Sequence, residues 1–278
     1  MKILITNDDG YAAQGLRELV EMLRPLGELT IVAPKYHQSG MSMAVSMGFR
    51  PIAVKHISDD PAESWWYLDG TPASCVKWAI DEIFTESKPD LLISGINHGA
   101  NTASAALYSG TLGAAREAAL AGIPAVGVSL DNMLPRADFS TVRGMFPDLL
   151  SKLISLMDGK FGTYYNVNFP DIPGKDIKGI RICHQGVMHW EREFRPYDKG
   201  IFARVGVNPE DMGISGFPQV EEGEKVYMMV GDIVDNDNNT EPSDHHMLAQ
   251  GYITLTAHKI DSTDYEESER LRKAGLGI

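Results

Sequence analysis

Two adjacent carboxylates near the start of the chain are the residues best suited to chemistry. Asp8 and Asp9 follow a short apolar run, Ile3 to Ile5, and are themselves followed by Gly10. Side-by-side carboxylates repel one another unless a cation neutralises them, and a hard cation such as Mg²⁺ or Mn²⁺ does so with oxygen ligands. The alternative is that both residues only cap the next helix, where Asp is favoured. Capping explains one carboxylate well and two badly.

Three further loops are rich in side-chain oxygens. Their polar residues are Ser39 and Gly40, then Asn97 and Asn101, then Ser109, Gly110 and Thr111. Ser39 and Asn97 supply neutral oxygens, which suits a metal that must also bind a charged phosphate. The segment from Ser109 to Thr111 stands at a helix start, where free N–H groups, the positive helix end and hydroxyls favour an anion. An ordinary helix cap has the same residues, so this alternative stays open.

The elements that must position these loops alternate between strand and helix. Near-continuous apolar runs predict strands at residues 2–6, 29–34, 90–95 and 124–129. Residues 64–69 are a further candidate strand, and a candidate edge strand of the sheet. Helical spacing is found at residues 16–23, 76–83, 111–120 and 139–154. Repeated strand–helix units of this kind indicate an α/β fold with a parallel sheet covered on both faces. Ligands bind outside the carboxyl ends of such strands, so all four polar loops are expected at one edge.

The pattern changes after about residue 160. Strand-like pieces at residues 165–169, 180–183, 226–230 and 252–256 are separated by Gly-, Pro- and Asp-rich stretches such as 232–244. The charged tail, residues 266–273, predicts a solvated helix. We therefore expect a catalytic core over residues 1–170 and a smaller, hairpin-rich, β-rich extension over residues 171–278 that also returns elements to the core.

The composition of the chain limits the kinds of partner that it is expected to bind. The chain of 278 residues carries 38 acidic and 25 basic side chains, a formal charge of −13, which repels a duplex nucleic acid. A bound cation reverses the local field for small phosphates. No apolar run approaches the roughly 20 residues that span a bilayer, and the N-terminus lacks a signal-peptide pattern, so no membrane partner and a cytoplasmic location are expected. Two cysteines, Cys75 and Cys183, are too few for a disulfide framework and are expected to be buried thiols.

Other motifs point elsewhere or are missing. His245 and His246 are adjacent, and adjacent imidazoles in a strand project to opposite sides, so no zinc site is predicted there. The chain has no GxGxxG after its first strand, no GxxxxGK[ST] and no GxSxG. A receiver domain also has an acidic pair after its first strand, but it needs a third Asp where this chain has Ser94 to Asn97, and a Lys that does not follow Val128.

Six segments together resemble the SurE (survival protein E) family. They are TNDDG (6–10), APKYHQSG (33–40), GTP (70–72), SGIN (94–97), YSGT (108–111) and NVNFP (166–170), with a looser match in SDHHMLAQGYITLT (243–256). The resemblance implies a Rossmann-like, three-layer core and metal-dependent hydrolysis of nucleoside 5′- and 3′-monophosphates to nucleoside and phosphate by a metal-activated water. Two departures from the family pattern are Ser74, where Asp is frequent, and Ala103, where a second Gly is frequent.

The resemblance also implies roles for the polar loops. Asp8, Asp9, Ser39 and Asn97 would bind one divalent cation per subunit, magnesium or manganese, with Asp8 and Asp9 catalytic. Phosphate and substrate would contact Gly40, Asn101, Ser109, Gly110 and Thr111. Homodimers or homotetramers with exchanged C-terminal arms are implied as well. A broader acid-type phosphatase, a short-chain exopolyphosphatase and a non-catalytic nucleotide-binding stress module remain the alternatives.

Overall fold

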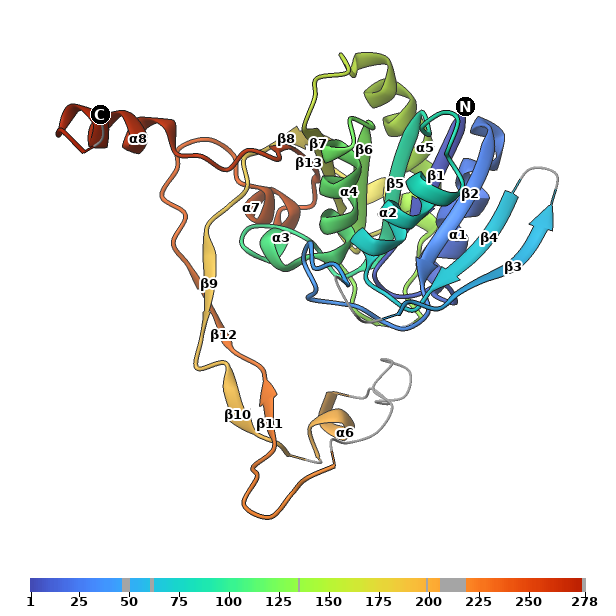
Figure 1. The fold of residues 1–278 in the computed structure, drawn as a ribbon. Coiled ribbons are helices and arrows are strands. Elements are labelled where there is room, and N and C mark those ends of the chain that lie inside the picture. The colour runs from blue at the N-terminus through green and yellow to red at the C-terminus, as the bar shows by residue number, and fades with distance from the viewer. Residues whose placement is uncertain (47–50, 61–62, 135, 199, 206–218, 277–278) are drawn as a thin grey trace.

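The centre of the fold is a mixed, mostly parallel sheet. A computed structural model describes residues 1–46, 51–60, 63–134, 136–198, 200–205 and 219–276, and in it the strand order is β3-β4-β2-β1-β5-β6-β7-β13-β8 (Figure 1). The strands are β1 (Lys2–Thr6), β2 (Glu28–Pro34), β3 (Val54–Asp60), β4 (Glu63–Leu68), β5 (Leu91–His98), β6 (Ala125–Leu130), β7 (Thr163–Phe169), β8 (Ile180–Ile182) and β13 (Ile253–Lys259). In this sheet the β3–β4 pair and the β7–β13 pair are antiparallel, and the other neighbouring pairs are parallel. The expected α/β class with a largely parallel sheet is confirmed.

Helices cover both faces of the sheet because side chains alternate along its strands. On β1, Ile3 and Ile5 point to one face and Leu4 to the other, and all three are fully buried. Helices α1 (Gln14–Leu23) and α5 (Ser140–Leu156) pack on the first face, and α2 (Pro72–Glu82) and α4 (Gly110–Leu120) on the second. Burying each aliphatic side chain contributes about 1.5–3 kcal/mol, so these two layers hold the β1 end in place.

One edge of the sheet differs from the expectation. Residues 64–69 were a candidate edge strand, but β4 lies between β2 and β3. Strand β3 itself was not predicted, because its residues are largely exposed and show no apolar run. An edge strand with one neighbour and little burial gives a weak sequence pattern.

A long two-stranded ribbon extends away from the sheet (Figure 1). It consists of β9 (Met188–Glu191) paired with β12 (Asp232–Asp235), β10 (Phe194–Pro196) paired with β11 (Tyr227–Met229), and α6 (Ile201–Val205). We call the described part of residues 188–235 the arm. The chain returns through α7 (Asp244–Ala249) to β13, and α8 (Tyr265–Lys273) then projects from the core as a charged helix.

Three short helical turns complete the fold: α3 (Ala105–Tyr108) and two 3₁₀ turns, Arg24–Leu26 and Gly174–Asp176. In the part of the chain that the structure describes, no helix combines the length and the apolar character needed to cross a bilayer.

Candidate active site

The strand order reverses at β1, with β2 and β4 on one side and β5, β6 and β7 on the other. The carboxyl ends of β1 and β5 therefore open the crevice in which such sheets bind ligands. Asp8 and Asp9 follow β1 after one intervening residue, Asn7, and Asn97 lies near the end of β5. The loop after β2 reaches the same place, because the Gln38 N–H donates to the Asp8 carbonyl oxygen at 2.7 Å. Ser39 is the next residue.

Asp8 is held by the first turn of α4. Its carboxylate is 3% exposed, and Oδ1 accepts a 2.6 Å hydrogen bond from Thr111 Oγ1. Gly110 allows this close approach, since a Cβ there would lie 2.8 Å from the Asp8 Cβ. Burial, and then the Asp9 charge, raise the pKa of Asp8 from 3.8 to about 7, although hydrogen bonds from Thr111 oppose the rise. Without a cation, Asp8 therefore favours its protonated form below neutral pH.

Asp9 is oriented by two histidines that the sequence analysis did not single out. Its Oδ2 accepts from the His98 N–H at 3.2 Å and lies 3.0 Å from His98 Nδ1. Its Oδ1 lies 3.4 Å from Nδ1 of His37, in the loop after β2. His37 precedes Ser39 by two residues and His98 follows Asn97, so both neighbours belong to loops that were already of interest. Contacts over such sequence separations cannot be read from spacing alone.

Asn97 presents an oxygen toward Asp8. Its Nδ2 donates to the Gly99 carbonyl oxygen at 2.7 Å, which turns Oδ1 toward the Thr111 hydroxyl, 3.4 Å away. Oδ1 of Asn97 and Oδ1 of Asp8 thus approach the same hydroxyl. An anchored amide of this kind offers a pre-oriented neutral ligand.

Asn101 is locked by a buried network. Its N–H donates to Asn168 Oδ1 at 2.8 Å, its Nδ2 donates to Ser129 Oγ at 2.9 Å, and its carbonyl oxygen accepts from Asn166 Nδ2 at 2.7 Å. Sequence analysis gave Asn166 and Asn168 no role in the site. Two asparagines in a buried strand were the available signal, because buried amides must find partners.

The segment from Ser109 to Thr111 serves more than one purpose. Ser109 caps α4, since its Oγ accepts from the Leu112 N–H at 3.1 Å, and it also faces the cleft described below. Thr111 is fully buried and its hydroxyl is used by Asp8. Of the five residues expected around the phosphate, Gly40, Asn101 and Ser109 line the cleft, and Gly110 and Thr111 do not.

A cleft of about 720 Å³ joins this site to the arm. Its core side is formed by Asp8, Ser39, Gly40, Asn97, Asn101, Ala105, Tyr108, Ser109 and Met133. Its arm side is formed by Trp190, Glu193, Met229, Val230 and Gly231. The Trp190 and Tyr108 rings meet edge to face with centroids 6.2 Å apart. The volume lies in the range of small-molecule sites, and the walls combine polar groups at one end with aromatic and apolar groups at the other.

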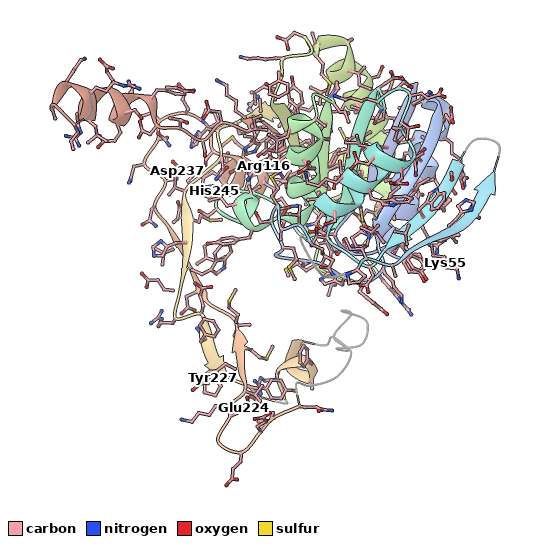
Figure 2. All side chains as sticks on the ribbon, viewed as in Figure 1. Lys55, Arg116, Glu224, Tyr227, Asp237 and His245 are labelled. Carbon is pink, nitrogen blue, oxygen red and sulfur yellow. The ribbon has the colours of Figure 1, made fainter. Side chains whose placement is uncertain are left out.

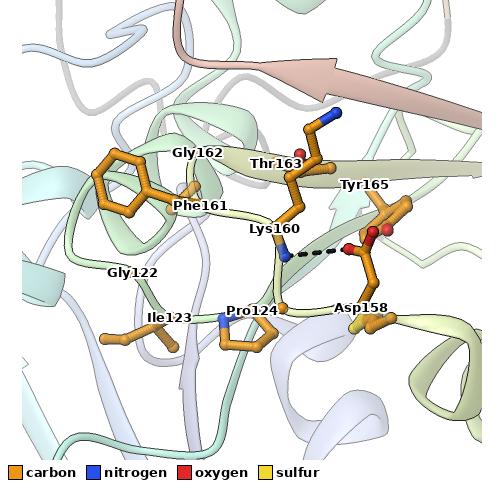
Figure 3. A pocket seen from close by; sticks show the side chains of 12 residues that line it. Gly122, Ile123, Pro124, Asp158, Lys160, Phe161, Gly162, Thr163 and Tyr165 are labelled. Atoms are coloured by element: carbon orange, nitrogen blue, oxygen red, sulfur yellow. Dashed lines mark hydrogen bonds between the residues drawn. The ribbon is translucent and has the colours of Figure 1, made fainter.

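A second, much smaller hollow lies elsewhere (Figure 3). Its walls come from Gly122 to Pro124, before β6, and from Asp158 to Tyr165, at the start of β7. The dashed line in Figure 3 joins the Lys160 N–H to Asp158 Oδ1, 3.0 Å apart. Because β6 and β7 are parallel, this hollow is at the edge of the sheet opposite the acidic pair.

The model of the family described as survival protein SurE matches residues 3–192. The chain belongs to the SurE family. A relative from Bacteroides fragilis named 5′-nucleotidase SurE is 34% identical over 274 residues, which cover 97% of this chain and 96% of the relative. One of the same name from Christiangramia forsetii is 37% identical, covering 94% and 92%. A crystal structure of the SurE protein from Aquifex aeolicus shares the fold with a TM-score of 0.75 and 27% identity, covering 99% of this chain and all of that one.

The two departures from the SurE pattern lie beside the site and not in it. The Ser74 hydroxyl is 2.9 Å from Thr71 Oγ1 and accepts from the Ser46 N–H at 3.2 Å. Ala103 has φ 47°, in the left-handed region that glycine adopts without strain. Its N–H donates to both oxygens of Asp244, at 3.0 and 3.1 Å, and this bifurcated hydrogen bond stabilises the unusual backbone conformation.

The residues of this SurE chain fit a hard divalent cation. Among the described residues, no Lys or Arg side chain forms an ion pair with Asp8 or Asp9, and the basic side chains beside Asp9 are those of His37 and His98. The buried Asp8 carboxylate, whose pKa is raised, and the amide oxygen of Asn97 approach the same Thr111 hydroxyl. An oxygen-rich, anionic site without a Lys or Arg partner matches the donor set that Mg²⁺ and Mn²⁺ prefer.

Proposed function

We propose that this chain is a metal-dependent phosphomonoesterase that hydrolyses nucleoside 5′-monophosphates, and 3′-monophosphates as well, to nucleoside and phosphate. The observation that carries the proposal is the cleft in which buried Asp8, with Ser39 and Asn97, stands at one end and an aromatic wall at the other. Asp9 follows Asp8 in the chain, is partly buried and does not itself line the cleft. Relatives named 5′-nucleotidase over nearly their full length support it. Acid and amide oxygens suit the phosphate end, and aromatic and apolar groups suit a nucleoside.

Asp8, Asp9, Ser39 and Asn97 are the proposed ligands of one magnesium or manganese ion per subunit. A divalent cation bound there would neutralise charge on the phosphoryl oxygens and lower the pKa of a water for attack on phosphorus. The chain's own part is to keep the ligands in place. Thr111 fixes Asp8, and His98 fixes Asp9.

The phosphate is proposed to lie between the start of α4 and Asn101. The positive end of an 11-residue helix favours an anion at Gly110 and Ser109. Asn101 gives one amide hydrogen to Ser129 and keeps the other for a phosphate oxygen. The glycine at position 40, with φ 75° and no atom near its Cβ direction, leaves the opposite wall open.

The nucleoside is proposed to lie against the arm. Trp190 and Tyr108 offer ring surfaces for a base, and base–aromatic stacking contributes about 1–3 kcal/mol. Glu193 lines the same wall and accepts hydrogen bonds from ribose hydroxyls or a base amino group. The arm would thus select nucleotides over smaller phosphate esters.

The direct test is phosphate release from a panel of nucleoside 5′- and 3′-monophosphates, glycerol phosphate and short polyphosphate. Each is measured with magnesium, with manganese and with a chelator. We expect the nucleotides to be the best substrates and the chelator to stop release. Equal rates on all esters would favour a broader acid-type phosphatase, and fastest release from polyphosphate an exopolyphosphatase. Nucleotide binding without any release would leave a binding module.

We also propose a homodimer or homotetramer in the cytoplasm. The arm and α8 both project from the core, and large apolar side chains on the arm are exposed, including Phe194 at 72% and Met229 at 68% (Figure 1). Such patches are characteristic of protein–protein contacts. Cys75 and Cys183 are unpaired, as a reducing compartment would keep them. Light scattering of the purified chain measures the mass, and a monomer would refute the assembly.

A further inference from the structure

Three metal-binding side chains meet at the base of the arm, outside the cleft. Asp235 ends β12, and His245 and His246 stand in the first turn of α7. Figure 2 shows His245 and Asp237 together at this junction of arm and core, away from Tyr227 at the distal end of the arm. None of these residues lines the cleft of the acidic pair.

The side chains converge because the two histidines lie on a helix. No zinc site was expected here from the sequence, because adjacent imidazoles in a strand project to opposite sides and lack the usual ligand spacing; the pair lies on a helix, so the premise of a strand is wrong. His246 Nε2 is 2.6 Å from Asp235 Oδ2, and His245 Nε2 is 3.4 Å from Asp235 Oδ1. The two imidazole centroids are 4.0 Å apart, and one ligand atom of each residue lies within 4.8 Å of the others.

The His245 ring is largely buried, with 11% of the side chain exposed, and neither ring nitrogen forms a hydrogen bond. The neighbouring carboxylate oxygens lie 3.4 Å from Nε2, in Asp235, and 3.6 Å from Nδ1, in Asp244. Asp244, the next carboxylate, is already engaged by the N–H groups of Ala103, Gly186 and His245 itself. A Cβ at Gly186 would lie 2.1 Å from His245 Nδ1, so the chain leaves space for this ring. Leaving a buried polar nitrogen unpaired is costly, and a metal ion would engage its lone pair.

We propose that Asp235, His245 and His246 form a second metal site, which binds a divalent transition-metal ion of the zinc class. Two imidazoles and a carboxylate are common ligands of zinc, and they suit it better than magnesium, which prefers oxygen alone. In tetrahedral zinc sites with bonds of about 2.0–2.2 Å, ligand atoms lie roughly 3.3–3.6 Å apart, so a small rotation of the half-exposed His246 closes the set. The fourth position would hold water.

Hydrogen bonds from neighbouring groups keep the Asp235 carboxylate in its ionised form. Asp235 Oδ1 accepts the Asp237 N–H at 2.9 Å, and that contact, with a further hydrogen bond from His246, lowers the pKa of Asp235 to about 2. The carboxylate is therefore ionised at any ordinary pH, as a ligand must be. Asp237 in turn pairs with His184 at 2.8 Å. A metal here would join β12 to α7 and fix the angle at which the arm leaves the core.

A plain ion-pair cluster is the competing interpretation, and metal binding separates the two. The test uses the full chain stripped of metal and carrying Asp8→Asn and Asp9→Asn, so that the proposed catalytic ion is absent. Zinc is titrated against a chromophoric chelator, and cobalt is followed by its visible absorption. We expect one zinc per chain and the intense cobalt bands of a tetrahedral site. His246→Gln should weaken zinc binding at least about tenfold, as loss of a ligand does.

His189→Gln is the matched control. His189 is on β9 beside Asn236. The His189→Gln substitution therefore removes an imidazole from the same junction without changing the three ligands, and the zinc affinity should stay unchanged. His246 is 47% exposed, so its variant is expected to fold, which a melting curve verifies. No zinc in the Asp8→Asn, Asp9→Asn chain, or equal affinity after His246→Gln, overturns the proposal. Neither outcome depends on phosphatase activity.

Discussion

Replacing Asp8 by Asn should stabilise the chelator-treated protein at alkaline pH while abolishing phosphate release. The pKa of Asp8 is about 7 in the folded chain and 3.8 as its ordinary value, because burial and the Asp9 charge disfavour the carboxylate. That difference corresponds to about 4 kcal/mol in the free energy of unfolding. Asn retains the shape and can still accept from Thr111, but it carries no charge to bury.

The direction in which the free energy of unfolding changes with pH follows from the protons that the folded and unfolded chains bind. Between about pH 4 and pH 7 the folded chain holds the Asp8 proton and the unfolded chain does not. The free energy of unfolding contributed by Asp8 is therefore fully present below about pH 4, falls as the pH rises, and is lost above about pH 7. In the Asp8→Asn variant this fall is absent. At about pH 8 the variant should melt roughly 8 °C higher than the wild type, from the usual 2 °C or more per kcal/mol.

Thermal unfolding followed by circular dichroism, in chelator, measures both proteins from about pH 5 to pH 8. Asp81→Asn is the control, because Asp81 is an exposed acid on α2. It should leave the pH dependence of the wild type unchanged. If Asp8→Asn and the wild type lose stability together over this range, or the variant melts lower at about pH 8, then Asp8 is not strained by its burial. The wild type with manganese should recover the stability that ionisation costs, since the ion binds the folded state.

Three further results are expected. Chelation should stop phosphate release, and the apparent affinity for added manganese should fall up to about tenfold per pH unit below about pH 7, because Asp8 must lose its proton to bind. Gly110→Ala should lower kcat at least about tenfold with the fold intact, since the new Cβ would lie 2.8 Å from the Asp8 Cβ and displace that carboxylate. Trp190→Ala should lower kcat/KM about tenfold or more for nucleoside monophosphates, from the loss of stacking, and leave glycerol phosphate hydrolysis nearly unchanged.

A specific result would contradict each of these three predictions. Metal affinity that is flat across the neutral range would separate Asp8 ionisation from metal binding. Gly144→Ala is the control for the glycine, because no atom lies near its Cβ direction, and it should stabilise helix α5 by about 0.5–1 kcal/mol. Equal activity losses in Gly110→Ala and Gly144→Ala would deny the close approach of α4 to Asp8. Equal losses on both substrates after Trp190→Ala would assign the tryptophan a structural role.

The core was predictable because its strands are buried on both faces. The run Ile3 to Ile5 is apolar throughout and Leu29 to Ala33 is apolar except for Thr30, and polar residues come soon after each. The carboxyl ends of parallel strands meet, so sequence order alone placed Asp8 and Asn97 near one another. Their roles as ligands remain a prediction, which the metal titrations address.

Only part of the arm was predicted: a strand was expected at residues 226–230, where β11 lies, but β9, β10 and β12 were not expected. Strand β12 lies in a stretch that reads as an Asp- and Asn-rich loop, and Ile233 is 61% exposed, so no burial pattern marks it. The helix that holds His245 and His246 is only six residues long and offers no periodicity to detect. Local patterns reflect burial against a core, and most of a ribbon that leaves the core does not produce them.

Asp244, in α7, shows how the arm is connected to the proposed active site. It is fully buried, and its carboxylate accepts the N–H of Ala103, 141 residues away, and of Gly186, 58 residues away. Ala103 follows Asn101, which lines the cleft, while Gly186 precedes the arm and His245 follows Asp244 on α7. The proposed phosphate loop, the origin of the arm and the proposed second metal site therefore share one buried anion.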